Sequence, residues 1–272
     1  MSRKKNNHYL SQCISKNFIE NSNQTFWEYN CSTKSNPVQK NINRLFSKRR
    51  LWGEGLENTI GKHMENIIAP ILKKYSTCQV DRIQHPSSDG TEEVQFNGFE
   101  ICEEDERKAL SKLLLQTSLL QRSNANGTNL DTEKNLQNFF EFDANVLKNI
   151  PLCVIEINPL MKAVPLILVD GMSFGFVAPN MPQKMDSIGH ICFIFPISTA
   201  RFLLWGNRND LDYFALKYQN IHFLNLCRIE QSGKKCRIAT QDKKYLDLLI
   251  PQIEPFSSGN SAVNVTLCRD WE

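Results

Sequence analysis

The spacing of apolar residues divides the chain into an extended amino-terminal segment, a helical middle and a strand-rich remainder. In residues 54–75, apolar side chains recur every three or four positions, which predicts one face of an amphipathic helix. The predicted inward residues are Leu56, Ile60, Met64, Ile67, Ile68, Ile71 and Leu72. Pro70 falls inside this run, so we expect the helix to kink or break there.

Two more helices are predicted before residue 150. Residues 104–122 open with acidic residues and close with Arg122, as the helix dipole favours. Its predicted inward residues are Ala109, Leu110, Leu113, Leu114, Thr117 and Leu120. Asp131 is a predicted cap for a third helix, whose apolar side chains extend to Ile150.

Strands are predicted from short β-branched or aromatic runs bounded by Pro, Gly, Asn and Ser. One is residues 25–29, and a short extended pair covers 79–83 and 93–101. The others are 152–157, 163–170, 174–177, 190–196 and 200–205, with one more in the tail at 262–268. Helices are expected from Asn209 or Asp210 onward and over 242–249.

These elements predict an α+β fold in which amphipathic helices pack on a mostly antiparallel sheet, with a basic amino-terminal arm. We divide it into the arm (1–52), a helical layer (53–150) and a sheet with carboxy-terminal helices (151–272). The three parts are expected to form one integrated domain, because 272 residues can bury a sizeable shared core.

Composition points to a cytoplasmic protein. No run of about 18 apolar residues is present, so no membrane span is expected, and the charged amino terminus lacks the apolar segment of a signal peptide. The nine cysteines include no Cys-x-x-Cys pair, which suits reduced, buried thiols better than disulfides or a zinc cage. The sequence identifies no cofactor.

Charge is distributed unevenly. Residues 1–52 hold ten Lys or Arg and two Glu, so this segment carries +8 and the remainder −5, within a net charge of +3. A positive face attracts phosphate-bearing partners such as nucleic acid. The alternative is an ordinary solvated surface, because the basic residues form no recognised nucleic-acid motif.

His8 is the best candidate for acid–base chemistry, because it titrates near neutrality and lies in a polar, basic segment. Gln12 could orient water or phosphate, and Lys16, Arg49 or Arg50 could stabilise phosphoryl charge. Glu57 and Glu65 could hold a divalent cation or act as a base. Structural alternatives stay open: His8 could tie the arm to the body, and both glutamates could be surface carboxylates.

Four stretches in order carry a family resemblance: NHYLSQCISKNF, FWEYN, NPVQKNINRLFSKRRLW and LENTIGKHMEN. They resemble the opening of the bacterial domain of unknown function (DUF) 4238 family, which begins His-His-Tyr-Val-Pro-Gln and ends that motif in Asn-Phe. Glu57 and Glu65 match its paired glutamates, and residues 109–122 its next helix, which often ends in Arg. FVAPNMPQ is similar to its Phe-x-Thr-Ser-Asp-x-Pro signature. The matching residues of the first motif are His8, Tyr9, Gln12, Asn17 and Phe18.

The resemblance implies a role in antiphage defence, since family members resemble components of defence loci carried by prophages and satellites. This chain departs from the pattern at Asn7, Ser11 and Asn180, which replace a His, a Pro and an Asp. A catalytic site built on two His and an Asp would be crippled here. Either the site binds without catalysis, or its chemistry depends on His8 and the glutamates.

We therefore expect an abortive-infection effector acting on nucleic acid, for example a nuclease, or on the translation machinery. Its catalytic residues would be His8, Gln12, Glu57 and Glu65. The alternative is a non-enzymatic sensor of a phage protein or a nucleic-acid-binding module; a structural subunit of an oligomer is a third hypothesis. The predicted nucleic-acid contacts are Lys16, Lys48, Arg49, Arg50 and Arg122, with Tyr9 and Asn180 as further binding residues.

Overall fold

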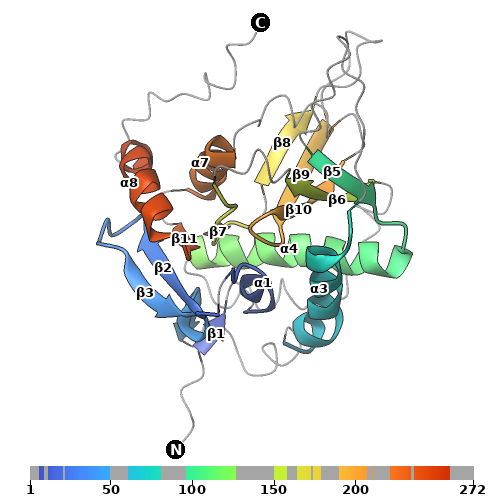
Figure 1. Ribbon diagram of the computed structural model, residues 1–272, viewed down its shortest axis with the longest axis horizontal. Helices are drawn as coiled ribbons and strands as arrows, with labels where there is room; N and C mark the ends of the chain where they lie inside the picture. The colour runs from blue at the N-terminus through green and yellow to red at the C-terminus, as the bar shows by residue number, and fades with distance from the viewer. Residues whose placement is uncertain are drawn as a thin grey trace, which may run out of the picture.

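The computed structural model describes twelve parts of the chain. They are residues 6–8, 12–20, 22–49, 61–80, 96–126, 150–157, 164–172, 174–178, 190–206, 210, 221–233 and 236–257. Within them the fold is α+β, with helices packed on antiparallel sheets, as predicted. Figure 1 shows the chain with these elements labelled.

The larger sheet has five strands in the order β5-β6-β10-β9-β8, and every neighbouring pair is antiparallel. The strands are β5 (Phe96–Glu100), β6 (Leu152–Ile157), β8 (Phe174–Ala178), β9 (His190–Pro196) and β10 (Arg201–Trp205). All five residues of β10 are buried, as its central place requires. The predicted strands 152–157 and 190–196 have these same bounds, because both are apolar runs with turn residues on each side.

The smaller sheet has four strands in the order β3-β2-β11-β7, again antiparallel throughout. The strands are β2 (Thr25–Asn30), β3 (Val38–Asn41), β7 (Leu168–Val169) and β11 (Arg237–Thr240). β2 was predicted from its aromatic residues, whereas β11 was not predicted. This sheet joins a strand from the start of the chain to one near its end. In the described residues the predicted single sheet is thus divided into these two sheets, and β1 (Asn6–His8) and β4 (Ser47–Arg49) form a further two-stranded pair.

Helices cover the sheets. The longest of the described helices is α4 (Glu104–Asn126), which extends the predicted helix 104–122 by four residues and runs along the five-stranded sheet in Figure 1. The helices α7 (Ile221–Ser232) and α8 (Lys243–Ser257) contact one another; α7 also contacts β7, and α8 contacts β11. The Trp205 indole N–H donates to Ser111 Oγ at 3.3 Å, which links β10 to α4.

The predicted break at Pro70 takes the form of a π-helical turn. Residues 61–63 are α-helical, η2 (Met64–Ile68) is a π-helix, and α3 (Ala69–Thr77) follows it, with the proline in its first turn. The Ala69 N–H donates to Met64 O, five residues back. Since this turn holds one extra residue, the buried set is Met64, Ile68, Leu72 and Tyr75. The predicted burial of Ile67 is wrong; it is 47% exposed.

The predicted end of the last helix near Leu249 is also wrong, because α8 continues through Pro251 to Ser257. A proline inside a helix leaves the carbonyl four residues earlier without its N–H donor. That residue is Asp247, and both Asp247 and Pro251 are exposed, so water can bond the carbonyl. Ile253, one half-turn further on, is buried at 2% exposure and keeps the helix packed.

Candidate nucleic-acid interface

The amino-terminal motif and the basic run form one antiparallel ribbon. β1 (Asn6–His8) pairs with β4 (Ser47–Arg49), so that Asn6 lies opposite Arg49, Asn7 opposite Lys48, and His8 opposite Ser47. These two segments are about forty residues apart in the sequence. The backbone pairing therefore places three of the residues predicted from the sequence, His8, Lys48 and Arg49, in one small structural unit.

A short helix, α1 (Gln12–Lys16), follows β1 and attaches the motif to the body. Ile14 is 1% and Phe18 2% exposed, and both belong to the main core. The helix contacts η2, α3 and the 3-10 helix η1 (Ile42–Arg44). Lys16 lies in its last turn and is exposed, while Gln12 is half-buried at its start. The two apolar anchors therefore leave Lys16 facing solvent.

The segment leading into β4 is held in the same way. Asn41 caps η1, and its side-chain oxygen accepts from the Asn43 N–H at 3.0 Å. Leu45 and Phe46 follow, with 1% and 0% exposure. Phe46 has a φ of 48°, in the left-handed region that side chains rarely adopt. Burial of the ring offsets that strain and fixes the point at which the basic strand begins.

The structure describes one of the two predicted glutamates, Glu65. Glu65 lies on the π-helical turn η2 and is exposed, and η2 as a whole contacts α1. π-helical turns occur frequently at functional sites. His63 precedes this turn and is half-buried, and burial, together with the Lys112 charge, lowers the pKa of His63. Glu57, Tyr9, Arg50 and Asn180 lie outside the described residues, and Arg122 lies within α4.

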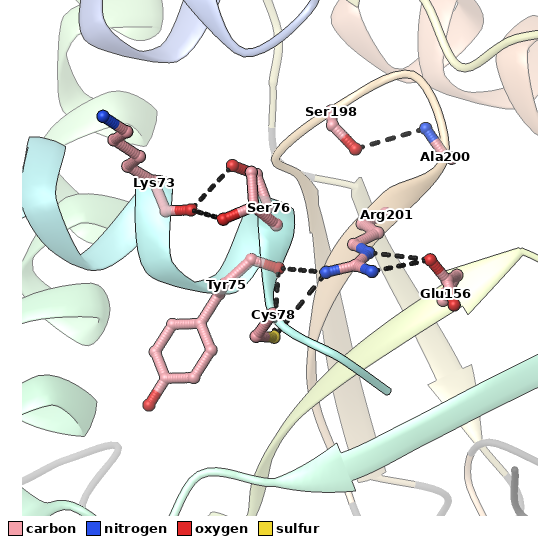
Figure 2. A network of polar contacts seen from close by, with 9 residues as sticks. Lys73, Tyr75, Ser76, Cys78, Glu156, Ser198, Ala200 and Arg201 are labelled. Carbon is pink, nitrogen blue, oxygen red and sulfur yellow. Dashed lines mark hydrogen bonds and ion pairs between the residues drawn. The ribbon is translucent and has the colours of Figure 1, made fainter. Parts of the chain in front are cut away.

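An arginine network that the sequence prediction missed lies at the carboxyl end of α3 (Figure 2). Arg201 begins β10 and is directly opposite Glu156 of β6. Its Nε and Nη2 donate to Glu156 Oε1 at 2.9 and 2.7 Å. Its Nη1 donates to the Tyr75 carbonyl at 3.0 Å and contacts Cys78 Sγ at 3.6 Å. A single charge inside each of two apolar strands was the sequence signal for this pair.

The same network continues to α4 through Glu106. The Tyr75 hydroxyl donates to Glu106 Oε2, and Lys74 Nζ bonds both carboxylate oxygens, at 2.9 and 3.0 Å. Burial would raise the pKa of Glu106, but the bonds from Tyr75 and Lys74 lower it overall. The network therefore joins α3 to α4 and to the five-stranded sheet, and α3 in turn supports α1.

A second cluster of charges extends across the four-stranded sheet. Glu28 Oε1 accepts from Lys40 Nζ at 2.5 Å and lies 3.8 Å from Arg237 Nη1. Asp170 lies next to them. Burial raises the pKa of Asp170 to about 7, although the backbone N–H groups of Arg237 and Gly171 that bond its carboxylate act to lower it. These groups belong to a different sheet from β1 and β4.

Comparison of the chain with known protein families, curated proteins and solved structures gives no match. The resemblance to the DUF4238 family therefore stays a prediction. Among the described helices, none combines the length and the apolar character that spanning a membrane requires. The same residues include no group of three His, Cys, Asp or Glu placed to hold a metal ion.

Proposed function

We propose that this protein binds nucleic acid through its amino-terminal unit, defined as β1, α1 and β4, and that it does so in antiphage defence, as the family resemblance implies. One observation carries the proposal. The β1–β4 pairing joins the His8 segment to the basic segment, so that Lys48 and Arg49 lie in a paired strand. Lys16 adds an exposed positive charge on the adjoining helix.

A fixed basic unit favours phosphate binding for two physical reasons. Each Lys or Arg that neutralises a phosphate releases a condensed counterion, and this release drives association. Residues on anchored elements also lose less conformational entropy on binding than residues on a loose tail. Burial of Ile14, Phe18, Leu45 and Phe46 provides that anchoring here.

The test compares two double variants for binding of a labelled oligonucleotide at several salt concentrations. We expect Lys48→Gln with Arg49→Gln to weaken binding and to reduce the slope of log K against log salt by about 1–2, since two phosphate contacts are lost. The matched control is Lys73→Gln with Lys244→Gln, which removes two exposed positive charges from α3 and α8. Equal effects of the two double variants would contradict a specific interface.

The effector hypothesis requires more than binding, and it depends on His8. The register favours it in one respect, because His8 lies opposite Ser47 and so is next to the basic residues that would hold a phosphate. A neutral imidazole there can accept a proton from an attacking water or hydroxyl.

Phage plating separates the two functions. Cells expressing the wild type, His8→Ala or a control variant, His222→Ala on α7, are infected, and soluble protein and melting temperature are measured for each. Loss of protection for His8→Ala alone, with folding and oligonucleotide binding retained, would support an enzymatic effector. If His8→Ala retains protection, the enzymatic role is excluded and binding is the proposed function that remains. If the wild type gives no protection, the defence role is excluded.

A further inference from the structure

Two cysteines face one another across the four-stranded sheet. Cys31 directly follows β2, and Cys236 directly precedes β11. Asn30 pairs with Arg237, so the next position along the antiparallel ladder places Cys31 opposite Cys236. The Cys31 N–H confirms this register, because it donates to the Cys236 carbonyl at 3.0 Å. The two residues are 205 positions apart in the sequence.

Their side chains already point at each other. The two Sγ atoms are 3.4 Å apart, and each residue is 2% exposed. Opposed residues of an antiparallel pair have Cα atoms about 4.5–5.5 Å apart, within the range of about 4.4–6.8 Å that disulfides occupy. The sulfurs need to approach by roughly 1.4 Å to reach a disulfide bond length. We expect rotation of the two side chains to bring the sulfurs together.

Cys153, which is partly buried, and Cys192, which is buried, have no such partner geometry with each other. Cys153 lies on β6 and Cys192 on β9, and β10 separates these two strands. Burial raises the pKa of Cys153 to about 11 and that of Cys192 to about 12, so both stay protonated near neutral pH. Cys102 is exposed on the segment before α4. These cysteines therefore supply internal controls.

We propose that Cys31 and Cys236 form a redox-responsive pair that closes to a disulfide when the protein encounters a peroxide. One sulfur attacks the peroxide, its S–O bond forms as the O–O bond breaks, and a sulfenic acid and water result. The second sulfur then displaces the hydroxyl, so that the S–S bond forms, the S–O bond breaks and a second water leaves. Two thiols are oxidised to one disulfide, and hydrogen peroxide is reduced to two waters.

The surroundings of the pair disfavour the thiolate form of Cys236. The hydrogen bond to Cys31, burial and the nearby Asp170 carboxylate all raise the pKa of Cys236. Since the thiolate is the reactive species, Cys236 reacts slowly with alkylating agents and with peroxide alike, so we expect oxidation to require prolonged exposure to peroxide. Once formed, the disulfide attaches β2, and with it the segment leading to β4, to the sheet strand that precedes α8.

The experiment oxidises the full-length, folded protein with hydrogen peroxide, blocks remaining thiols, digests it without reductant and searches by mass spectrometry for a peptide joining residues 31 and 236. We expect this peptide in the wild type and in the control Cys192→Ser, and its loss in Cys31→Ser. The oxidised wild type should melt at least about 5 °C higher than the reduced form, because the bridge closes a very long loop. Dithiothreitol should reverse this increase.

Two results would overturn the proposal. One is oxidation of the exposed Cys102 in the folded protein with no linked peptide from 31 and 236. The other is a linked peptide that forms only after the protein is unfolded in urea. Both results come from the wild type, so the test stands even where Cys31→Ser folds poorly.

Discussion

At the scale of single residues, Lys34 occupies an unfavourable backbone conformation. Its φ is 50°, in the exposed turn after β2, where its N–H donates to the Asn30 carbonyl at 3.1 Å. A left-handed conformation costs an L-residue about 1–2 kcal/mol, and glycine avoids this cost. We therefore expect Lys34→Gly to raise the free energy of unfolding by about 0.5–1 kcal/mol, measured by urea denaturation.

The control for this substitution is Lys73→Gly, which replaces an exposed lysine inside α3. Glycine in a helix costs about 1 kcal/mol, so the two substitutions should change stability in opposite directions. A loss of stability in both would show that the turn holds Lys34 without strain. Phe46 has nearly the same φ but 0% exposure, and there glycine would remove a core ring along with the strain.

At the scale of elements, the sequence predicted what local pattern determines. The strands 152–157 and 190–196 were found because their apolar runs end at turn residues. β11 was missed because its four residues, Arg237–Thr240, follow a predicted break and include a charge at their start. Its strand conformation depends on β2 and β7, which lie on either side of it and come from distant parts of the chain. Ile67 was misplaced because the π-helical turn adds one residue to the helical period.

The candidate site shows the same difference between what local sequence pattern predicts and what depends on contacts between distant segments. Residue types and charge were enough to select His8 and the basic run, but their pairing depends on contacts across forty residues and could not be derived from local pattern. Arg201 was overlooked because a lone arginine in an apolar strand does not reveal its partner. Only the β6–β10 register places Glu156 opposite it.

The Arg201 network predicts how strongly α3 is held to the sheet. Arg201 and Glu156 have side chains 10% and 23% exposed. Arg201→Met leaves Glu156 and the Tyr75 carbonyl without their donor, so we expect a loss of about 2–4 kcal/mol in the free energy of unfolding. The double variant Arg201→Met with Glu156→Met should recover most of it, because a well-packed apolar pair replaces the ion pair at little cost.

Urea denaturation of the single and double variants measures this, and Lys243→Met is the control. Lys243 bonds Asp247 at 2.6 Å on the surface of α8, with side chains 46% and 49% exposed. An exposed pair of this kind contributes less than about 1 kcal/mol. If the double variant is no more stable than Arg201→Met, the lost energy comes from the bonds to α3 and not from the unpaired Glu156.

At the scale of the whole molecule, the four-stranded sheet unites the two ends of the described chain. β2 and β3 come from the first fifty residues, while β11 lies near residue 240. The main core likewise contains Phe26, Leu110 and Leu203, one from each of the three predicted parts. We therefore expect charges on this sheet to influence the stability of the entire fold rather than of one segment.

Asp170 makes that stability depend on pH. Burial raises its pKa from 3.8 to about 7, so between these values the folded protein holds a proton that the unfolded chain has released. The stabilisation linked to this proton is fully present below about pH 4 and is lost as the pH rises through 7. We expect Asp170→Asn, which cannot ionise, to remove this slope and to be more stable than the wild type at pH 8, by roughly 1–4 kcal/mol.

Urea denaturation at pH 5, 6, 7 and 8 tests this expectation, with Asp247→Asn as the control because Asp247 is exposed on α8. The control should keep the wild-type slope. Equal slopes for wild type and Asp170→Asn would mean that the carboxylate is ionised in the folded protein. In that case the positive charge of Arg237 and the two backbone N–H groups must outweigh burial, and Glu28 would share Arg237 with a second charged carboxylate.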